Sequence, residues 1–326
     1  MAKDTRPDSP WAGAKPRTER PSRRERERER ERQAEAGKRP PPSPARDDRR
    51  GARSDAPARG GGHRPAAADA APSVPREAPS SREQRLYGLN ACLAAFARRP
   101  EALRKVYLSE ARIGALKTVL AWCVQRRIGY RVVEADDLDR LTASRHHEGV
   151  CFDLLRPEPI ALSALLDAQP PAPTASLLLW LDGVGNPHNL GALLRSAAHF
   201  GVGGVIVPAR AGLDVSGAAA RVAEGAAEVV PLAHADDAQQ ALRDLHARGY
   251  ALAATVPRDG APLYATTLPR RLVLVLGAEG EGMSEPMIAA ADLRLTIPGS
   301  GAIESLNVAA SVAVLLGEYW RQSPPG

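Results

Sequence analysis

Six apolar runs in the C-terminal half of the chain constrain its fold more than any other feature. The runs are "LLLWLDGV", "GGVIVP", "EVVPL", "YALAATV", "RLVLVLG" and "LRLTIP", and segments with helical spacing alternate with them, including residues 190–200, 235–248 and 307–321. Continuous apolar strands separated by helices are typical of a parallel sheet with helices on both faces. The sequence therefore predicts an α/β domain over residues 176–322, followed by a short tail, residues 323–326.

Ligands on such sheets usually bind outside the carboxyl ends of the strands. This rule points to the loops at residues 183–189, 277–283 and 299–306. The first, "GVGNPHNLG", begins like a dinucleotide-binding fingerprint but has His188 where the third glycine is needed, and "GAEGEG" has its glycines in the wrong order. The fingerprint of a nicotinamide-dependent dehydrogenase is therefore missing. Such an enzyme remains an alternative on topology alone.

A second, smaller α/β unit is expected over residues 83–156. The unit begins with "EQRLYGLNACLAAFARRP", in which Leu89 to Phe96 have helical spacing, and "ALKTVLAWCVQRRIGY" repeats that spacing with Gly129 as a candidate helix C-cap. The strand-like runs "LRKVYLS", "YRVVE" and "HHEGVCFDLL" alternate with these helices. The adjacent His146 and His147 are expected to be structural or exposed, with an RNA contact as the alternative. A linker rich in Pro and Ala, residues 157–175, separates this unit from the larger domain.

The first 82 residues differ from the rest in composition and charge. They contain no Leu, Ile, Phe or Tyr, and they hold 13 of the chain's 29 prolines. A segment with so little apolar area cannot offset the conformational entropy lost on folding, so a disordered arm is expected. It carries 21 Lys and Arg against 13 Asp and Glu, whereas the remaining 244 residues carry 23 against 25. Such an arm attracts phosphate non-specifically; a solubilising tail is the alternative.

The chain shows no sign of a membrane or disulfide-dependent protein. No apolar run is long enough for a transmembrane helix, and the N-terminus lacks the apolar segment of a signal peptide. The three cysteines, Cys92, Cys123 and Cys151, have neither metal-ligand nor C-x-x-C spacing. We therefore expect a reduced, cytoplasmic protein without a metal.

The three loops together carry a specific resemblance. "NPHNLGALLRSAAHFGV", "LVLVLGAEGEGMSE" and "LTIPGSGAIESLNVAASVAVLLGEYW" occur in this order, and they resemble the three motifs of the SpoU (TrmH) class of RNA 2′-O-ribose methyltransferases in the SPOUT superfamily. The upstream "YGLNACLAAF" through "HHEGVCF" is similar to the substrate-binding domain that often precedes that catalytic domain. The likeness covers about 240 residues. "NPHN" and the basic arm resemble the YfiF-type branch of this class.

This resemblance implies a C-terminal trefoil knot, bound S-adenosylmethionine, tRNA or rRNA as substrate, and a homodimer formed through the knotted domain. The helix "NVAASVAVLLGEYW" is apolar nearly all round, as a helix buried on most sides would be. A partner subunit can cover one of its sides, although burial within a single subunit explains the pattern equally well.

Arg195 and Asn189 are the candidate catalytic residues of the first motif. The planar guanidinium of Arg195 can hold a phosphate bidentately, and the resemblance also assigns the matching arginine to activation of the hydroxyl. That second role conflicts with the high pKa of guanidinium, and a substrate phosphate can accept the proton instead. A snorkelling Arg195 is the structural alternative. Asn189 is expected to cap the following helix, and the resemblance places an Asn there to orient Arg195 or the RNA; one side chain can do both.

The second and third motifs supply the remaining candidates. Glu279 can fix Arg195, contact the cofactor or meet the dimer partner; an exposed loop acid is the alternative. The resemblance assigns cofactor contacts to Glu279 and Ser305 and to the backbone of Gly277, Ile297 and Leu306. It places Asn307 with Asn189, Arg195 and Glu279 among the catalytic residues; Ser305 is also a candidate helix cap.

Three positions depart from the family pattern. Ala309 replaces a hydroxyl residue, Gly299 stands where Met is common, and Glu224 stands where a small residue is usual. Ala309 and Glu224, together with the basic arm, support a non-catalytic RNA-binding or ribosome-associated protein on the same fold as the alternative function.

Overall fold

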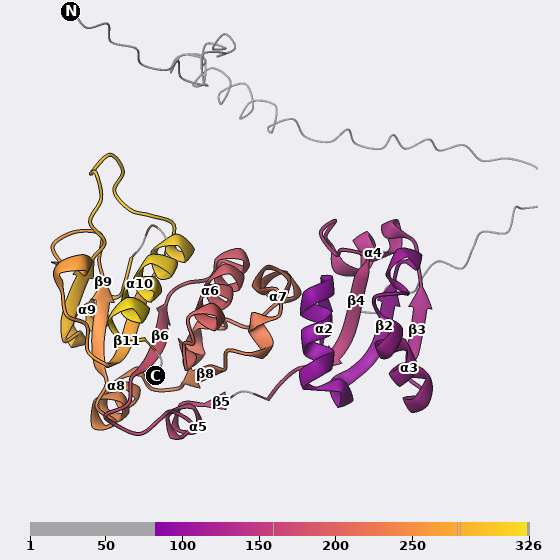
Figure 1. The fold of residues 1–326 in the computed structure, drawn as a ribbon, viewed down its shortest axis with the longest axis horizontal. Helices are drawn as coiled ribbons and strands as arrows, with labels where there is room; N and C mark the ends of the chain where they lie inside the picture. The colour runs from indigo at the N-terminus through magenta and orange to yellow at the C-terminus, as the bar shows by residue number, and fades with distance from the viewer. Residues whose placement is uncertain (1–81, 159, 279, 281, 325–326) are drawn as a thin grey trace, which may run out of the picture. The chain divides into compact units, whose positions relative to one another are not determined.

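The computed structural model describes residues 82–158, 160–278, 280 and 282–324, which form two sheets with their helices (Figure 1). The expected arm lies outside the described residues except for Arg82. No helix among these residues is both long and apolar enough to cross a membrane.

The smaller unit contains a four-stranded sheet in the order β1-β4-β2-β3. Its elements are β1 (Glu83–Tyr87), α2 (Leu89–Arg98), β2 (Leu103–Leu108), α3 (Lys117–Arg126), β3 (Gly129–Val132), α4 (Ala135–Thr142) and β4 (Val150–Leu155). Strand β4 runs antiparallel to β1 and β2, whereas β2 and β3 are parallel. The predicted strands are confirmed. The predicted Gly129 cap is wrong, because Arg127 ends α3 in the left-handed conformation with φ 57° and Gly129 already begins β3.

The two adjacent histidines of this unit have different environments. His146 is exposed, whereas His147 is buried, with Nε2 3.1 Å from an Asp139 carboxylate oxygen and Nδ1 accepting from the Gly149 amide at 2.9 Å. These bonds fix the turn that leads into β4. His147 is therefore structural, in agreement with the first of its two expected roles.

The larger unit is an eight-stranded sheet in the order β10-β12-β9-β11-β6-β7-β8-β5, and every neighbouring pair is parallel. Its strands are β5 (Ile160–Ala161), β6 (Ser176–Asp182), β7 (Gly204–Pro208), β8 (Leu232–Ala235), β9 (Ala251–Thr255), β10 (Ala261–Pro262), β11 (Arg271–Gly277) and β12 (Leu293–Thr296). Its helices are α5 (Leu162–Asp167), α6 (Pro187–His199), α7 (Gly217–Ala223), α8 (Ala238–Ala247), α9 (Glu285–Ala290) and α10 (Val308–Gln322).

Helices cover both faces of this sheet, as predicted. One core packs alternate β6 residues such as Leu179 against α6, α7 and α10, and the other packs Trp180 and its neighbours against α5, α8 and α9. Alternation along a strand sends successive side chains to opposite faces, so the continuous apolar run within β6, Leu177–Leu181, supplies both cores. The α/β fold class is therefore confirmed.

Two segments differ from their expected structure. The run "EVVPL" is not a strand: residues Ala226–Glu228 form a 3-10 turn, and β8 begins only at Leu232. The expected linker contains β5, which pairs with β8, and α5, whose Leu162, Leu165 and Leu166 are buried in a core. These residues complete the edge of the large sheet.

Close contact between α6 and α7 depends on Gly191. A Cβ at this position would lie 2.5 Å from the Ala219 carbonyl oxygen and 2.7 Å from Val222 Cβ. Only glycine fits there without displacement, because these distances are below van der Waals contact. Gly191 therefore allows the close packing of α6 on α7.

Candidate functional site

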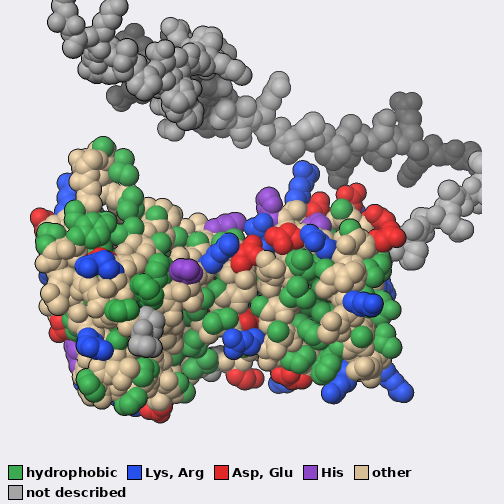
Figure 2. Space-filling model, in the orientation of Figure 1, with side chains coloured by type: hydrophobic (Ala, Val, Ile, Leu, Met, Phe, Trp, Pro, Cys, Tyr) green, Lys and Arg blue, Asp and Glu red, His purple; other side chains and the backbone are tan. Residues whose placement is uncertain are grey.

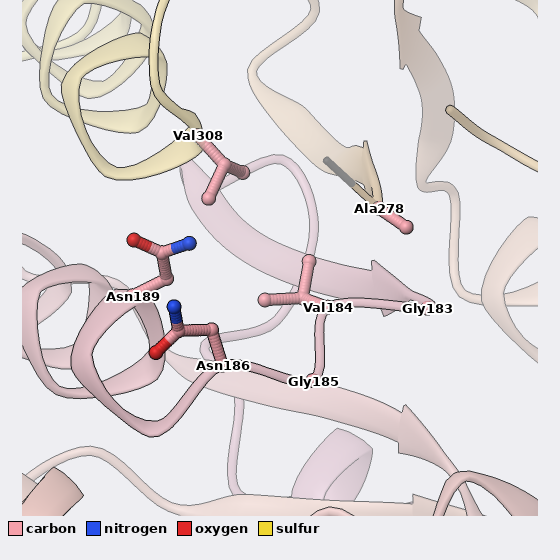
Figure 3. Close-up of a pocket in the computed structure, with 7 residues that line it drawn as sticks. All are labelled: Gly183, Val184, Gly185, Asn186, Asn189, Ala278 and Val308. Atoms are coloured by element: carbon pink, nitrogen blue, oxygen red, sulfur yellow. The ribbon is translucent and has the colours of Figure 1, made fainter. Parts of the chain in front are cut away.

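A pocket of about 310 Å³ lies at the carboxyl end of β6 (Figure 3). Gly183, Val184, Gly185, Asn186, Asn189, Ala278 and Val308 line it. These residues come from the loop after β6, the first turn of α6, the end of β11 and the first residue of α10. The pocket therefore lies where parallel α/β sheets usually bind ligands.

Asn186, not Asn189, caps α6. The Asn186 Oδ1 accepts a hydrogen bond from the His188 amide at 2.9 Å, and Pro187 occupies the first helical position, where its missing N–H costs nothing. Asn189 lies inside the first turn and is 9% exposed. Its expected role as the cap is therefore wrong, because an asparagine followed by proline begins the helix three residues earlier.

Asn189 instead contacts Asn307 of the third loop. The Asn307 Nδ2 donates to the Asn189 Oδ1 at 3.1 Å, although 118 residues separate the two positions. Asn307 also caps α10, because its Oδ1 accepts from the amides of Ala309 and Ala310 at 3.0 and 3.4 Å. The cap is therefore Asn307 and not Ser305, which is exposed. The first and third loops meet through this amide pair.

Arg195 lies two turns into α6 and is exposed. Six residues of helix rotate it about 120° away from Asn189 around the axis, so the two side chains leave α6 in different directions. Arg195 is not among the residues that line the pocket, and no described residue forms an ion pair with it. Its guanidinium is accessible to a ligand that reaches beyond the pocket.

The second loop folds back on the end of β11. The Ala278 and Gly282 backbones form two hydrogen bonds of 2.8 and 3.0 Å, and the Asp182 Oδ2 accepts from the Ser284 amide at 2.7 Å. A Cβ on Gly277 would lie 2.5 Å from the Gly282 carbonyl carbon and 2.6 Å from the Met283 nitrogen. Glycine is therefore required at Gly277 for this turn to close. Glu279 lies outside the described residues.

The third loop presents apolar and polar groups to solvent. Ile303 and Leu306 are 70% and 45% exposed, whereas Ile297 packs against the core beneath α10. Exposed apolar side chains in this loop, together with the turn at Gly277 that leaves no room for a Cβ, are compatible with a cofactor held by apolar and backbone contacts.

The three departures from the family pattern lie at different places. Ala309 is half-buried in the first turn of α10, and its backbone amide, not its side chain, contacts Asn307. Gly299 is exposed, and a Cβ added there would meet no atom within 4 Å. Glu224 follows α7 with φ 52°, and its carboxylate accepts from Asn90 Nδ2 at 2.7 Å. None of them lines the pocket.

Sequence reasoning missed two residues that shape this site, Asn186 and Asp182. The first has a recognisable signal, since Asn before Pro is a typical start of a helix. The second follows an apolar strand directly, but its partner amide lies 102 residues further along the chain. Only the folded chain reveals that pairing.

Two family models match the described domains. The SpoU rRNA Methylase family matches residues 176–317, and the RNA 2′-O ribose methyltransferase substrate binding family matches residues 85–159. The first match contains the eight-stranded sheet from β6 onward and all three loops. The second match contains the whole four-stranded sheet except its first two residues.

Individual relatives agree with these matches. YfiF, an uncharacterized tRNA/rRNA methyltransferase of Escherichia coli O157:H7, is 39% identical over 241 residues, which are 74% of this chain and 69% of the relative. The 23S rRNA (guanosine-2′-O-)-methyltransferase RlmB of Nitrosomonas europaea is 35% identical over 244 residues, 73% of this chain and 92% of the relative.

Solved structures have the same fold. A crystal structure of an RNA 2′-O ribose methyltransferase is 26% identical with a TM-score of 0.59, covering 74% of this chain and 89% of its own. An AdoMet-bound rRNA methyltransferase from Sinorhizobium meliloti is similar in fold, with a TM-score of 0.61, 23% identity and coverage of 74% and 88%. From the two family models and the coverage of its relatives, the chain belongs to the SpoU rRNA methylase family.

Proposed function

We propose that the protein transfers a methyl group from S-adenosylmethionine to a ribose 2′-hydroxyl of rRNA or tRNA in the cytoplasm. The observation that carries this proposal is the Asn189–Asn307 hydrogen bond, which joins the first and third loops beside a pocket that the second loop also lines. Methyl transfer needs the acceptor and the donor held in one place, and positioning of this kind lowers reaction barriers by about 7–11 kcal/mol in favourable cases.

S-adenosylmethionine supplies an electrophilic methyl group when it is bound. Backbone groups of Gly277, Ile297 and Leu306 are the proposed contacts, with Ser305 and Glu279 beside them. The folded-back turn after Gly277 and the exposed Leu306 support this assignment, since one brings backbone close to the pocket and the other offers apolar surface. Recognition through backbone explains why these positions carry plain side chains.

Arg195 is the proposed phosphate ligand for the RNA. Its exposure and its lack of an acidic partner among the described residues leave the planar guanidinium ready for two phosphate oxygens. A guanidinium is a poor base, so the hydroxyl proton passes to another acceptor, for which a substrate phosphate is suitable.

The division of labour follows the domains. Residues 83–156 bind the RNA, residues 176–322 perform the chemistry, and the basic arm adds long-range attraction for phosphate. On the face drawn in Figure 2, basic and acidic side chains of the described residues are interspersed and do not gather in one basic patch. The excess of Lys and Arg in residues 1–82 therefore supplies charge that this face lacks.

We also propose a homodimer formed through a knotted C-terminal domain. Helix α10 packs against α6 in one core, yet its Trp320 is 46% exposed. A large exposed aromatic side chain suits a protein contact better than water. Sedimentation velocity would test it: a dimer is expected, and a monomer at micromolar concentration would contradict it.

The function is tested with labelled S-adenosylmethionine and total rRNA or total tRNA. We expect label in one class of RNA, located at 2′-O positions by resistance to alkaline cleavage. Arg195→Ala should lower transfer strongly and Arg195→Lys less, because lysine keeps the charge but loses the bidentate geometry. No transfer to either class above Arg195→Ala would refute the proposal. RNA binding without cofactor binding in calorimetry would then favour the non-catalytic alternative.

A further inference from the structure

The pocket is polar without containing a charge. Its seven lining residues include no acidic or basic side chain, and its only polar side chains are those of Asn186 and Asn189. Val184, Ala278 and Val308 supply apolar walls. The direction in which the two amides present their donors and acceptors therefore decides which ligand the pocket accepts.

The oxygen of each amide is already occupied by the protein. The Asn186 Oδ1 accepts from the His188 amide at 2.9 Å, and the Asn189 Oδ1 accepts from the Asn307 Nδ2 at 3.1 Å. These bonds fix which end of each side chain faces the cavity. Figure 3 shows the Asn186 nitrogen pointing toward Asn189 and the Asn189 nitrogen on the side of Val308 and Val184.

We propose that Asn186 and Asn189 form a pair of N–H donors that binds oxygen atoms of the target nucleotide of the RNA. Two amide nitrogens facing one neutral cavity select a ligand rich in acceptors, and sugar, phosphate and base carbonyl oxygens are such groups. This inference rests on the proposed function. It adds Asn186, which no motif assignment includes, as a substrate-binding residue.

The pocket suits the RNA better than the cofactor. None of Gly277, Ile297 and Leu306 lines it, although Ala278 and Val308 are neighbours of the cofactor loops, so the pocket lies beside that site without sharing its residues. Gly183, Gly185 and Asn186 are exposed, which opens the pocket to a macromolecule. Its volume is at the lower end for ligand pockets, about 300–1,000 Å³, and suits one nucleotide.

Asn186→Asp tests the proposal because it separates the two functions of the side chain. Aspartate keeps the oxygen that caps α6 and gains from the helix dipole, so the thermal midpoint should not fall. It replaces the donor with an anion that repels RNA oxygens. Losing one hydrogen bond to a ligand corresponds to about a tenfold rise in the KM for RNA, and repulsion adds to it.

Two further variants and a cofactor measurement complete the experiment. Asn186→Ser keeps a capping oxygen on a shorter side chain, and it should also raise the KM. The matched control is Asp237→Asn, which exchanges the same pair of residue types at the cap of α8, where Oδ1 accepts from the Gln239 amide at 2.8 Å. This control should leave KM unchanged. Calorimetry without RNA should give the wild-type Kd for S-adenosylmethionine in Asn186→Asp.

An unchanged KM for RNA in Asn186→Asp would overturn the proposal. Weakened binding of S-adenosylmethionine without RNA would also overturn it, because the pocket would then belong to the cofactor. If the wild-type protein transfers no methyl group, the proposed function fails, and the Kd for total rRNA and total tRNA measured by filter binding still decides this inference. Equal Kd values for wild type and Asn186→Asp would then refute it.

Discussion

The Asn307 side chain has two structural roles, and two different substitutions distinguish their contributions. It caps α10 through Oδ1 and holds Asn189 through Nδ2. Asn307→Ala removes both: loss of the cap costs about 1 kcal/mol, and leaving the nearly buried Asn189 Oδ1 without a donor costs about 1–3 kcal/mol. We therefore expect this variant to lose about 2–4 kcal/mol of unfolding free energy.

Asn307→Asp keeps the capping oxygen but turns the donor into an acceptor. The Asn189 amide must then rotate so that its nitrogen faces residue 307, which withdraws that N–H from the pocket and points its oxygen there. The unfolding free energy should change by less than about 1 kcal/mol, while kcat/KM falls at least about tenfold. Asn307→Asp should thus lose activity with little loss of stability, whereas Asn307→Ala should lose stability markedly.

Urea denaturation and steady-state methylation are the two assays, and a double-mutant cycle with Asn189→Ala isolates the amide pair. Contacting residues in one hydrogen-bond network usually couple by about 0.5–3 kcal/mol. Additive stability effects of Asn189→Ala and Asn307→Ala would refute the bond between them. Full activity in Asn307→Asp would show that the orientation of Asn189 does not matter for the reaction.

Three further outcomes follow from the structure and the charge distribution. Gly277→Ala should abolish cofactor binding in calorimetry, because the added Cβ would lie 2.5 Å from the Gly282 backbone. Gly299→Ala should bind the cofactor normally, because no atom lies within 4 Å of its added Cβ. Equal cofactor binding by the two variants would refute a cofactor role for the Gly277 turn. Hydrogen bonds from Arg321 and Gln322 lower the pKa of Glu318 from 4.5 to about 2. The stability that Glu318→Gln loses should therefore be constant above about pH 5 and vanish as pH falls toward 2, as followed by urea denaturation; a pH-independent difference would contradict the ion pair. Deleting residues 1–82 should leave the melting temperature unchanged and reduce the slope of log Kd for RNA against log salt; an unchanged slope would exclude phosphate contacts by the arm.

The elements that could be predicted from sequence are those whose burial leaves an unbroken apolar pattern. β6 and β11 lie in the middle of the sheet with helices on both faces, so almost every residue is apolar. The run "EVVPL" was wrongly predicted as a strand because its valines follow a turn: Val230 is buried but Val229 is 50% exposed. Pro231 also lacks the N–H that a strand needs. The true strand β8 reads "LAHA", which is only weakly apolar.

The site could be predicted as a set of loops but not as a set of contacts. Parallel topology places the carboxyl ends of β6 and β11 at the same edge of the sheet, and this much follows from the sequence. That the two strands are neighbours is seen only in the fold. The choice of Asn186 over Asn189 as the cap depends on Pro187, a local signal. The bond between Asn189 and Asn307 depends on how α6 and α10 pack, and no periodicity in the chain encodes a pairing across 118 residues.

The convergence of two helix starts explains how a pocket without a charged side chain can still attract RNA. Asn186 begins α6 and Val308 begins α10, and both residues line the same cavity. Asn186 and Asn307 already accept hydrogen bonds from amides of the first turns, so the partial positive charge at each helix start comes from the helix dipole. This field favours oxygen-rich or anionic groups within the first turn. Because the field is local and fixed, it adds little to long-range attraction but selects the group that enters. Affinity from the arm and the upstream domain would then bring the RNA near, while the two asparagines and the helix starts decide which nucleotide stays; swapping the arm between relatives should change salt dependence without changing the methylated position.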